Sequence, residues 1–314
     1  MANFIEVLHR NLDLVNRRGP VSGSLLNSVV LSSALATTYL LLGMFAFSMA
    51  VQNANITCQA FFPEGVSLVC VIIFGPRVAP GIFLGQFILA QYTGLPADAS
   101  AIIALINAAQ GILGGHLFWR WRISPRLNRP RDIAMLFVLC ALIIQPISAT
   151  GGIAAQYFLV NLSTERIVSV WLYWWAGNVL GQMLVLPLVL TWISTPGTLL
   201  EKKEIRHALL VVGLYFIPVA IFVFGDWGEN GPLYRLLTFA AFYLPLIWLA
   251  VQSRVRTVAL ANLLLTSPFL CLINAGPDLA LFFFQSKSPP LCGHYYSCRH
   301  CHFAVDLGPL GAVV

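Results

Sequence analysis

The sequence predicts an all-α fold, a polytopic transmembrane bundle of about eight or nine helices with a cytoplasmic N-terminus. Three observations support this fold class. Of the 314 residues, 58% are hydrophobic and only 10% are charged, whereas soluble domains carry about 25% charged residues. Apolar segments recur along most of the chain and are separated by short polar loops. The basic residues collect in alternate loops, as the positive-inside rule requires of a multi-pass protein.

The chain divides into three parts. Residues 1–27 are polar and amphipathic, which indicates a cytoplasmic arm, and no cleavable signal peptide is evident. Residues 28–285 contain the apolar segments and form the predicted transmembrane domain. Residues 286–314 change abruptly in composition towards Cys, His, Tyr and Pro, so this tail is expected to be disordered or read in a shifted frame.

The transmembrane domain contains nine apolar segments. They cover about residues 29–51, 66–74, 78–92, 101–119, 133–160, 167–193, 208–224, 233–251 and 258–284. The second is short for a crossing, which needs about 20 residues, so it either crosses or is re-entrant. The fifth is expected to be broken or kinked around Pro146 and Gly151-Gly152.

The charge pattern decides between these two possibilities. If the N-terminus is cytoplasmic and every segment crosses, fourteen of the eighteen Lys and Arg residues fall on the inside. If the second segment is re-entrant, the later loops change sides and this bias is lost. We therefore predict that the second segment crosses, with the Glu64 turn outside and the Arg77 turn inside.

Small residues recur four positions apart in three of the segments. The pairs are Gly81 and Gly85, Gly111 and Gly115, and Gly177 and Gly181. Such spacing lets transmembrane helices approach closely. The pairs serve either packing within one bundle or a dimerisation face.

Uncharged polar side chains share two of these helices: Asn107 with Gln110, and Asn178 with Gln182. Such groups are costly in lipid unless they have partners, so the two helices are expected to face one another or to line a polar interior. Gln145, beside Pro146, is expected to join them. They either fix the bundle by hydrogen bonding or form a small-ligand pocket.

Two further features have alternative interpretations. Glu64 lies near the predicted interface, where a carboxylate is usually solvated, although it could bind a cationic group or a proton. Trp171, Trp174 and Trp175 lie at the outer end of their segment, as an aromatic belt would, or form the wall of a ligand site. The candidate ligand or packing core comprises Glu64, Asn107, Gln110, Gln145, Trp174, Trp175, Asn178 and Gln182.

Two motifs resemble those of MASE1, a family of multi-spanning bacterial sensor domains. The first comprises Phe62-Pro63-x-Gly65, then Gly75-x-Arg77-x-x-Pro80-Gly81-x-x-x-Gly85, then Asn107. The second comprises Trp174-Trp175-x-Gly177-Asn178-x-x-Gly181, followed by Pro187. Asn178 stands where members often have a carboxylate, which argues against proton or cation binding at that position.

The resemblance implies a sensory input module in the bacterial inner membrane. Such domains precede histidine kinases, diguanylate cyclases and cyclic-di-GMP phosphodiesterases and receive a small-molecule or protein signal. No output domain is recognisable in the chain. We therefore expect a non-enzymatic module from a truncated protein, which is either orphaned or acts with a separate partner in trans. The alternative function is a small-solute transporter or permease, because the helices are broken and carry polar residues.

No cofactor and no nucleic-acid partner are expected; the partner that composition requires is the lipid bilayer. The tail contains Cys298-Arg-His-Cys301-His302, which matches the pattern of c-type haem attachment. With Cys292 and His294, the same residues could instead hold zinc. Both patterns are short enough to arise by chance, so no function is assigned to them.

Overall fold

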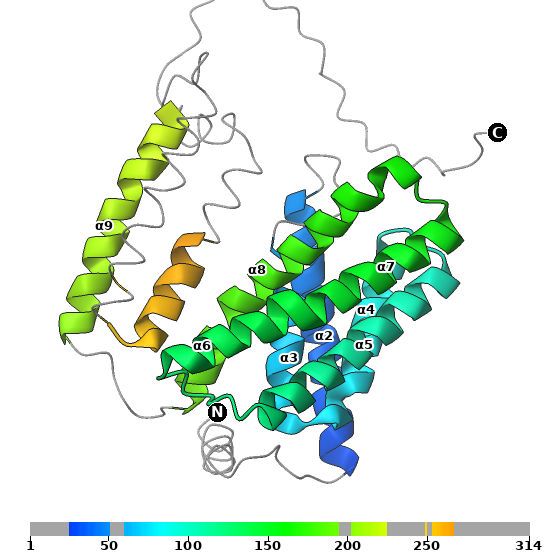
Figure 1. Ribbon diagram of the computed structural model, residues 1–314, viewed down its shortest axis with the longest axis horizontal. Helices are drawn as coiled ribbons and strands as arrows, with labels where there is room; N and C mark the ends of the chain where they lie inside the picture. The colour runs from blue at the N-terminus through cyan, green and yellow to red at the C-terminus, as the bar shows by residue number, and fades with distance from the viewer. Residues whose placement is uncertain (1–24, 51–59, 195–201, 225–248, 250–252, 267–314) are drawn as a thin grey trace, which may run out of the picture.

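A computed structural model describes residues 25–50, 60–194, 202–224, 249 and 253–266, and every regular element in these ranges is helical. The longer helices, shown in Figure 1, are α2 (Leu25–Ala50), α3 (Phe62–Phe74), α4 (Ala79–Tyr92), α5 (Ala97–Arg120), α6 (Pro130–Phe137), α7 (Gln145–Val160), α8 (Ile167–Ser194) and α9 (Lys202–Phe224). The all-helical class is thus confirmed for this part of the chain. Most of the predicted arm, the segment 233–251 apart from residue 249, the end of the ninth segment and the tail lie outside the described residues.

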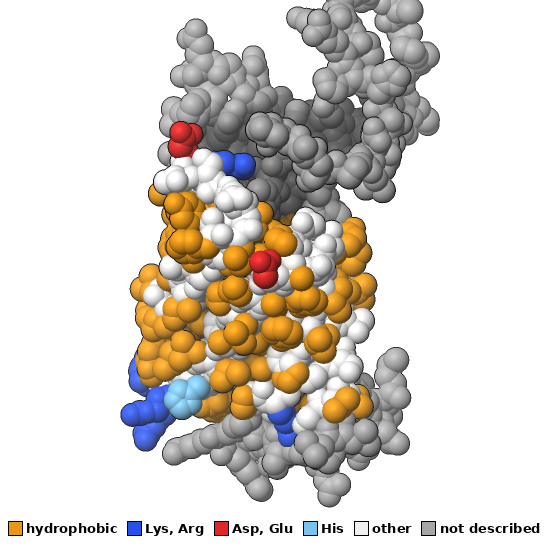
Figure 2. All heavy atoms as spheres, turned by 90° about the vertical axis from the view of Figure 1, so that its right-hand side faces the viewer, with side chains coloured by type: hydrophobic (Ala, Val, Ile, Leu, Met, Phe, Trp, Pro, Cys, Tyr) orange, Lys and Arg blue, Asp and Glu red, His pale blue; other side chains and the backbone are white. Residues whose placement is uncertain are grey.

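Four helices within the described ranges are long and apolar enough to cross a membrane. They cover Asn27–Phe47, Ala97–Arg120, Pro130–Val160 and Thr164–Ser194. Figure 2 shows a broad band of hydrophobic side chains on one face of the molecule, with basic side chains gathered at its lower end. A band of this kind is what lipid-facing helices present.

Helix α3 occupies the centre of the bundle. It packs against α2, α5 and α8, while α4 lies against α2 and α5, and α7 lies against α5 and α8. Nine of its thirteen residues are buried. At 1.5 Å per residue α3 is only about 20 Å long, shorter than a hydrocarbon core of about 30 Å.

The start of α3 lies inside the bundle. The backbone N–H of Phe61 donates to the carbonyl of Gly177 on α8, at 2.9 Å. Gly177 is about 15 Å along α8 from the first residue of that helix. The other end of α3 lies level with the end of α5, because Trp119 Nε1 donates to the Ile72 carbonyl at 3.0 Å. Helix α3 therefore runs from the interior to one end of the bundle.

A tight turn joins α3 to α4. Gly75 has a φ of 79°, a backbone conformation that favours glycine, and its N–H caps α3 through the Val71 carbonyl. A 3₁₀ turn, Pro76–Val78, leads into α4, whose first turn holds Pro80. Pro63 likewise occupies the first turn of α3. Proline suits both places because the first N–H groups of a helix have no intrahelical acceptor.

The helix Pro130–Val160 is continuous, so it is not broken at Pro146 or at Gly151-Gly152. A π-helical segment, Val138–Ile144, lies directly before Gln145 and Pro146 and accommodates the proline within the helix. The Gln145 N–H donates to the Cys140 carbonyl, five residues back. With the same five-residue spacing, an N–H at position 146 would donate to the Ala141 carbonyl, but proline has no N–H. The indole Nε1 of Trp175 donates to the Ala141 carbonyl instead, at 2.7 Å.

Several helix ends lie on the same side of the bundle. Ser32, near the start of α2, donates to the Arg77 carbonyl at 3.2 Å, so α2 begins beside the Arg77 turn. Helices α2 and α4 run in the same direction, because Ser32 approaches Gly81 while Gly43 approaches Leu89. The end of α5 reaches the same side, since α3 and α5 end level with one another. These basic segments were predicted from charge alone to share one side.

Candidate functional site

The candidate site is a set of polar side chains in the interior of the bundle, with Glu64 on α3 at its centre. Glu64 is only 1% exposed. The interpretation of Glu64 as a solvated carboxylate at the interface is therefore wrong. The physical reason is that α3 begins inside the bundle against α8, and Glu64 lies in its first turn.

Glu64 has hydrogen-bond donors on two other helices. The Tyr39 hydroxyl on α2 lies 2.9 Å from Glu64 Oε1. Gln110 Nε2 on α5 donates to Glu64 Oε2. The ion pairs found among the described residues involve Glu204 rather than Glu64. The carboxyl group is thus held in the interior by neutral polar groups.

Tyr39 also contacts Gln86 on α4, and its Oη lies 2.7 Å from Gln86 Oε1. Asn107 Nδ2 on α5 donates to both, at 3.3 Å to Tyr39 Oη and 3.2 Å to Gln86 Oε1. A phenolic hydroxyl carries one proton, so Tyr39 donates either to Glu64 or to Gln86 at any moment. The other contact then needs a proton on Glu64 or a turned Gln86 amide. These contacts therefore allow two hydrogen-bonded arrangements.

The network continues into α7 and α8. Ser148 Oγ on α7 donates to Asn107 Oδ1 at 3.0 Å, and Trp174 Nε1 on α8 donates to Ser148 Oγ at 3.3 Å. A chain of hydrogen bonds therefore connects Glu64 to Trp174 through Tyr39, Asn107 and Ser148. We call the connected set, Tyr39, Glu64, Gln86, Asn107, Gln110, Ser148 and Trp174, the Glu64 network.

The amides of α8 form a second polar contact. Asn178 Nδ2 donates to Gln145 Oε1 on α7 at 2.9 Å, and all three amides, Gln145, Asn178 and Gln182, are buried. The helices carrying Asn107 and Asn178 do not simply face one another as expected, because α3 and α7 each pack against both of them. Both helices instead line one polar interior, which was the alternative expectation.

Three buried amide atoms have no hydrogen-bond partner within the described residues. They are Gln110 Oε1, Gln145 Nε2 and Gln182 Oε1. Buried polar groups are nearly always paired in folded proteins. The interior therefore retains hydrogen-bonding capacity that water or a small polar ligand could use.

The tryptophans pack towards α7 rather than forming a simple belt. Trp171 and Trp175 stack with ring centroids 6.2 Å apart, and Trp171 Nε1 donates to Thr150 Oγ1 at 3.1 Å. A Cβ on Gly152 would lie 2.8 Å from the Trp174 ring. Gly152 thus makes room for Trp174 and does not break the helix.

The glycine pairs lie where helices of the same chain approach closely. A Cβ on Gly81 would lie 2.3 Å from the Ser32 carbonyl oxygen, and one on Gly181 would lie 2.2 Å from the Phe61 carbonyl oxygen. Gly65 of α3 faces Val185 and the Gly181 carbonyl from the other side. Similar approaches involve Gly85 with Tyr39, Gly111 with Ile82 and Gly115 with Val71. Each of these close approaches joins two segments of the same chain.

Three members of the Glu64 network were not predicted from the sequence: Tyr39, Gln86 and Ser148. Each is a polar side chain in a largely apolar segment. That property was a usable signal, because an isolated polar group in a lipid-embedded helix needs a partner. Pro187, by contrast, has no contact with the network that the structure records; it lies inside α8, where Thr191 Oγ1 donates to its carbonyl at 2.6 Å.

The described residues contain no group of three or more His, Cys, Asp or Glu side chains suited to a metal. The Cys and His residues of the tail, from Cys292 to His302, lie outside the described residues.

The fold and the site define an all-helical membrane protein with a polar network in its interior. The family model of MASE1 matches residues 21–276, and the chain belongs to the MASE1 family. MASE1 is a family of membrane-associated sensor domains, so the chain is a membrane sensory module. No curated protein and no solved structure matches the chain.

Proposed function

We propose that this chain is the sensory input module of a bacterial signalling system in the plasma membrane, and that it detects its signal through the Glu64 network. A small molecule or protein would bias the network, and the helices would pass the change to a cytoplasmic kinase, cyclase or phosphodiesterase, including one acting in trans. The module itself performs no reaction in this proposal.

The position of Tyr39 between two acceptors is the observation that carries the proposal. Its hydroxyl contacts Glu64 on α3 and Gln86 on α4, and it can donate to only one of them at a time. A sensor needs an element with two arrangements of similar free energy, because a signal shifts an equilibrium only by its differential affinity for the two. The same side chains join α2, α3, α4 and α5, so a change in the hydrogen bonds acts on four helices.

The output of a chimaera tests this proposal. Residues 1–285 are joined to a diguanylate cyclase catalytic domain, and cyclic-di-GMP is measured in cells. Glu64→Gln removes the ionisable carboxyl group and Tyr39→Phe removes the hydroxyl shared by the two arrangements, and each variant is expected to change the output about fivefold or more. Glu165→Gln, at an exposed position, is the control. If both variants accumulate in the membrane and retain the wild-type output, the proposal is wrong.

We also propose that the chain crosses the membrane eight or nine times, about as the apolar segments suggest, with its N-terminus in the cytoplasm. The common location of the Arg77 turn, the start of α2 and the end of α5 supports this orientation. Alkaline phosphatase, which is active only outside the cytoplasm, is fused after Leu95 or after Arg126. Activity is expected only for the first fusion, and the reverse pattern contradicts the orientation.

A further inference from the structure

A cavity of about 470 Å³ lies at the basic end of the molecule, away from the Glu64 network. Its polar lining comes from three places in the chain. Arg126 and Asn128 come from the loop between α5 and α6, Thr191 from the end of α8, and Ser253, Arg254 and Arg256 from the start of the helix Val255–Thr266. We propose that this cavity binds the phosphate group of an anionic ligand.

The charge of the cavity favours an anion. Three guanidinium groups line it, and Arg256 and Arg254 lie 3.5 Å and 3.9 Å from the carboxylate oxygens of Glu204 on α9. The three guanidinium groups give the lining its cationic character. Glu204 also accepts from Thr257 Oγ1 at 3.2 Å. These contacts hold Arg254 and Arg256 in place beside the cavity.

The lining also offers the geometry that phosphate recognition needs. Guanidinium groups present several N–H donors in a plane and match phosphate oxygens better than an ammonium group does. The Arg256 side chain is 7% exposed and the Arg254 side chain is 56% exposed, so one lies in the interior and the other at the rim. Ser253 Oγ is buried and has no hydrogen-bond partner within the described residues. It supplies a hydroxyl that a phosphate oxygen would satisfy.

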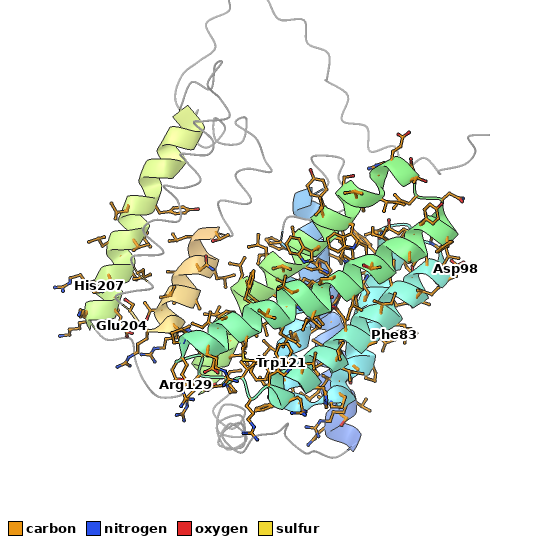
Figure 3. The ribbon with its side chains drawn as sticks, in the orientation of Figure 1. Phe83, Asp98, Trp121, Arg129, Glu204 and His207 are labelled. Atoms are coloured by element: carbon orange, nitrogen blue, oxygen red, sulfur yellow. The ribbon has the colours of Figure 1, made fainter. Side chains whose placement is uncertain are left out.

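The size and the position of the cavity suit a phosphate ester. Ligand cavities are commonly about 300–1,000 Å³, so this one has room for a phosphate and the group attached to it. The candidate spans α5 and α8 both end here, at Arg120 and Ser194. In Figure 3, Arg129 and Glu204 lie towards the same end of the molecule, whereas Asp98 lies towards the other. Basic cavities between helix ends at this depth can reach lipid head groups as well as soluble phosphates.

The experiment uses the full chain in detergent and two probes. Native mass spectrometry measures the binding of phosphatidylglycerol against phosphatidylcholine, which has the same phosphodiester but a compensating cation. Thermal unfolding in lipid-free detergent measures binding of pyrophosphate. Arg126→Gln and Arg254→Gln are each expected to lower the affinity for the probe that binds by about tenfold or more. Arg120→Gln, exposed on the last turn of α5 and outside the cavity, is expected to leave binding unchanged.

Selective binding of phosphatidylglycerol identifies the source of the phosphate as lipid, and stabilisation by pyrophosphate identifies a soluble compound. Either result supports the proposal when both cavity variants weaken binding of that probe. Two results overturn the proposal. In one, neither probe binds the wild-type chain. In the other, Arg120→Gln weakens binding as much as the cavity variants, so that overall charge and not the cavity is responsible. Unfolding without a probe establishes that each variant is folded.

Discussion

The Tyr39 hydroxyl lies 2.9 Å from Glu64 Oε1, across 25 residues of sequence and between two helices. Both side chains are buried, with Tyr39 0% and Glu64 1% exposed. The free energy of each hydrogen bond is therefore tied to the packing of α2 against α3. Four predictions follow from the contacts of the interior, each measured on the full chain in detergent.

Removing the Glu64 carboxyl leaves the buried Gln110 Nε2 without its acceptor, while the Tyr39 hydroxyl retains its contact with Gln86 Oε1. Glu64→Ala is expected to lower the free energy of unfolding by about 1–3 kcal/mol per group left unsatisfied. Thermal unfolding measures the effect. Glu165→Ala, which truncates an exposed carboxylate, is expected to leave the unfolding temperature unchanged. Equal stability of the two variants would show that Glu64 is hydrated.

The contact between Tyr39 and Glu64 should also appear as a coupling energy. In a double-mutant cycle, Tyr39→Phe and Glu64→Gln are expected to differ from additivity by about 0.5–3 kcal/mol, as groups within one hydrogen-bonded network do. The control cycle pairs Glu64→Gln with Tyr92→Phe, because Tyr92 is 65% exposed at the end of α4. Additive effects in the first cycle would contradict the contact.

Gly181→Ala would place a Cβ 2.2 Å from the Phe61 carbonyl oxygen and push α3 away from α8. Overpacking of this kind is expected to reduce stability by about 1–3 kcal/mol or more, since the obstacle is backbone. Gly213→Ala on α9 is the matched control because its Cβ would meet nothing within 4 Å. In a helix that exchange is expected to be neutral or stabilising by up to about 1 kcal/mol. The same response of both variants in thermal unfolding would show that α8 does not approach Phe61 closely.

Trp175→Phe keeps an aromatic ring but removes the N–H that serves the Ala141 carbonyl beside Pro146. The loss of this hydrogen bond is expected to lower the free energy of unfolding by about 1 kcal/mol. Trp192→Phe is the control, since Trp192 is half-exposed near the other end of α8. A stability change no larger than that of the control would mean that another donor, such as water, serves the carbonyl.

Several features of the site followed from the sequence. The amides of α5, α7 and α8 were predicted to be interior because polar groups in lipid need partners, and Asn107, Gln110, Gln145, Asn178 and Gln182 are all buried. The remaining network members were not predicted, because the sequence does not show which distant residue is the partner of a tyrosine, glutamine or serine in a largely apolar segment. Their partners lie up to 68 residues away in the chain, as for Asn107 and Tyr39.

The sequence by itself determined the class of this protein and the course of most described helices. Hydropathy and the positions of Gly and Pro are local properties, and they mark helix ends such as the Gly75 turn without reference to the rest of the chain. Only the tertiary structure decided the depth of Glu64. That depth depends on Gly65 and Gly181, which are far apart in sequence, letting α3 begin against the middle of α8. Close approach of two backbones is a property of the packed bundle, so no local pattern around Glu64 could reveal that its carboxyl group is buried.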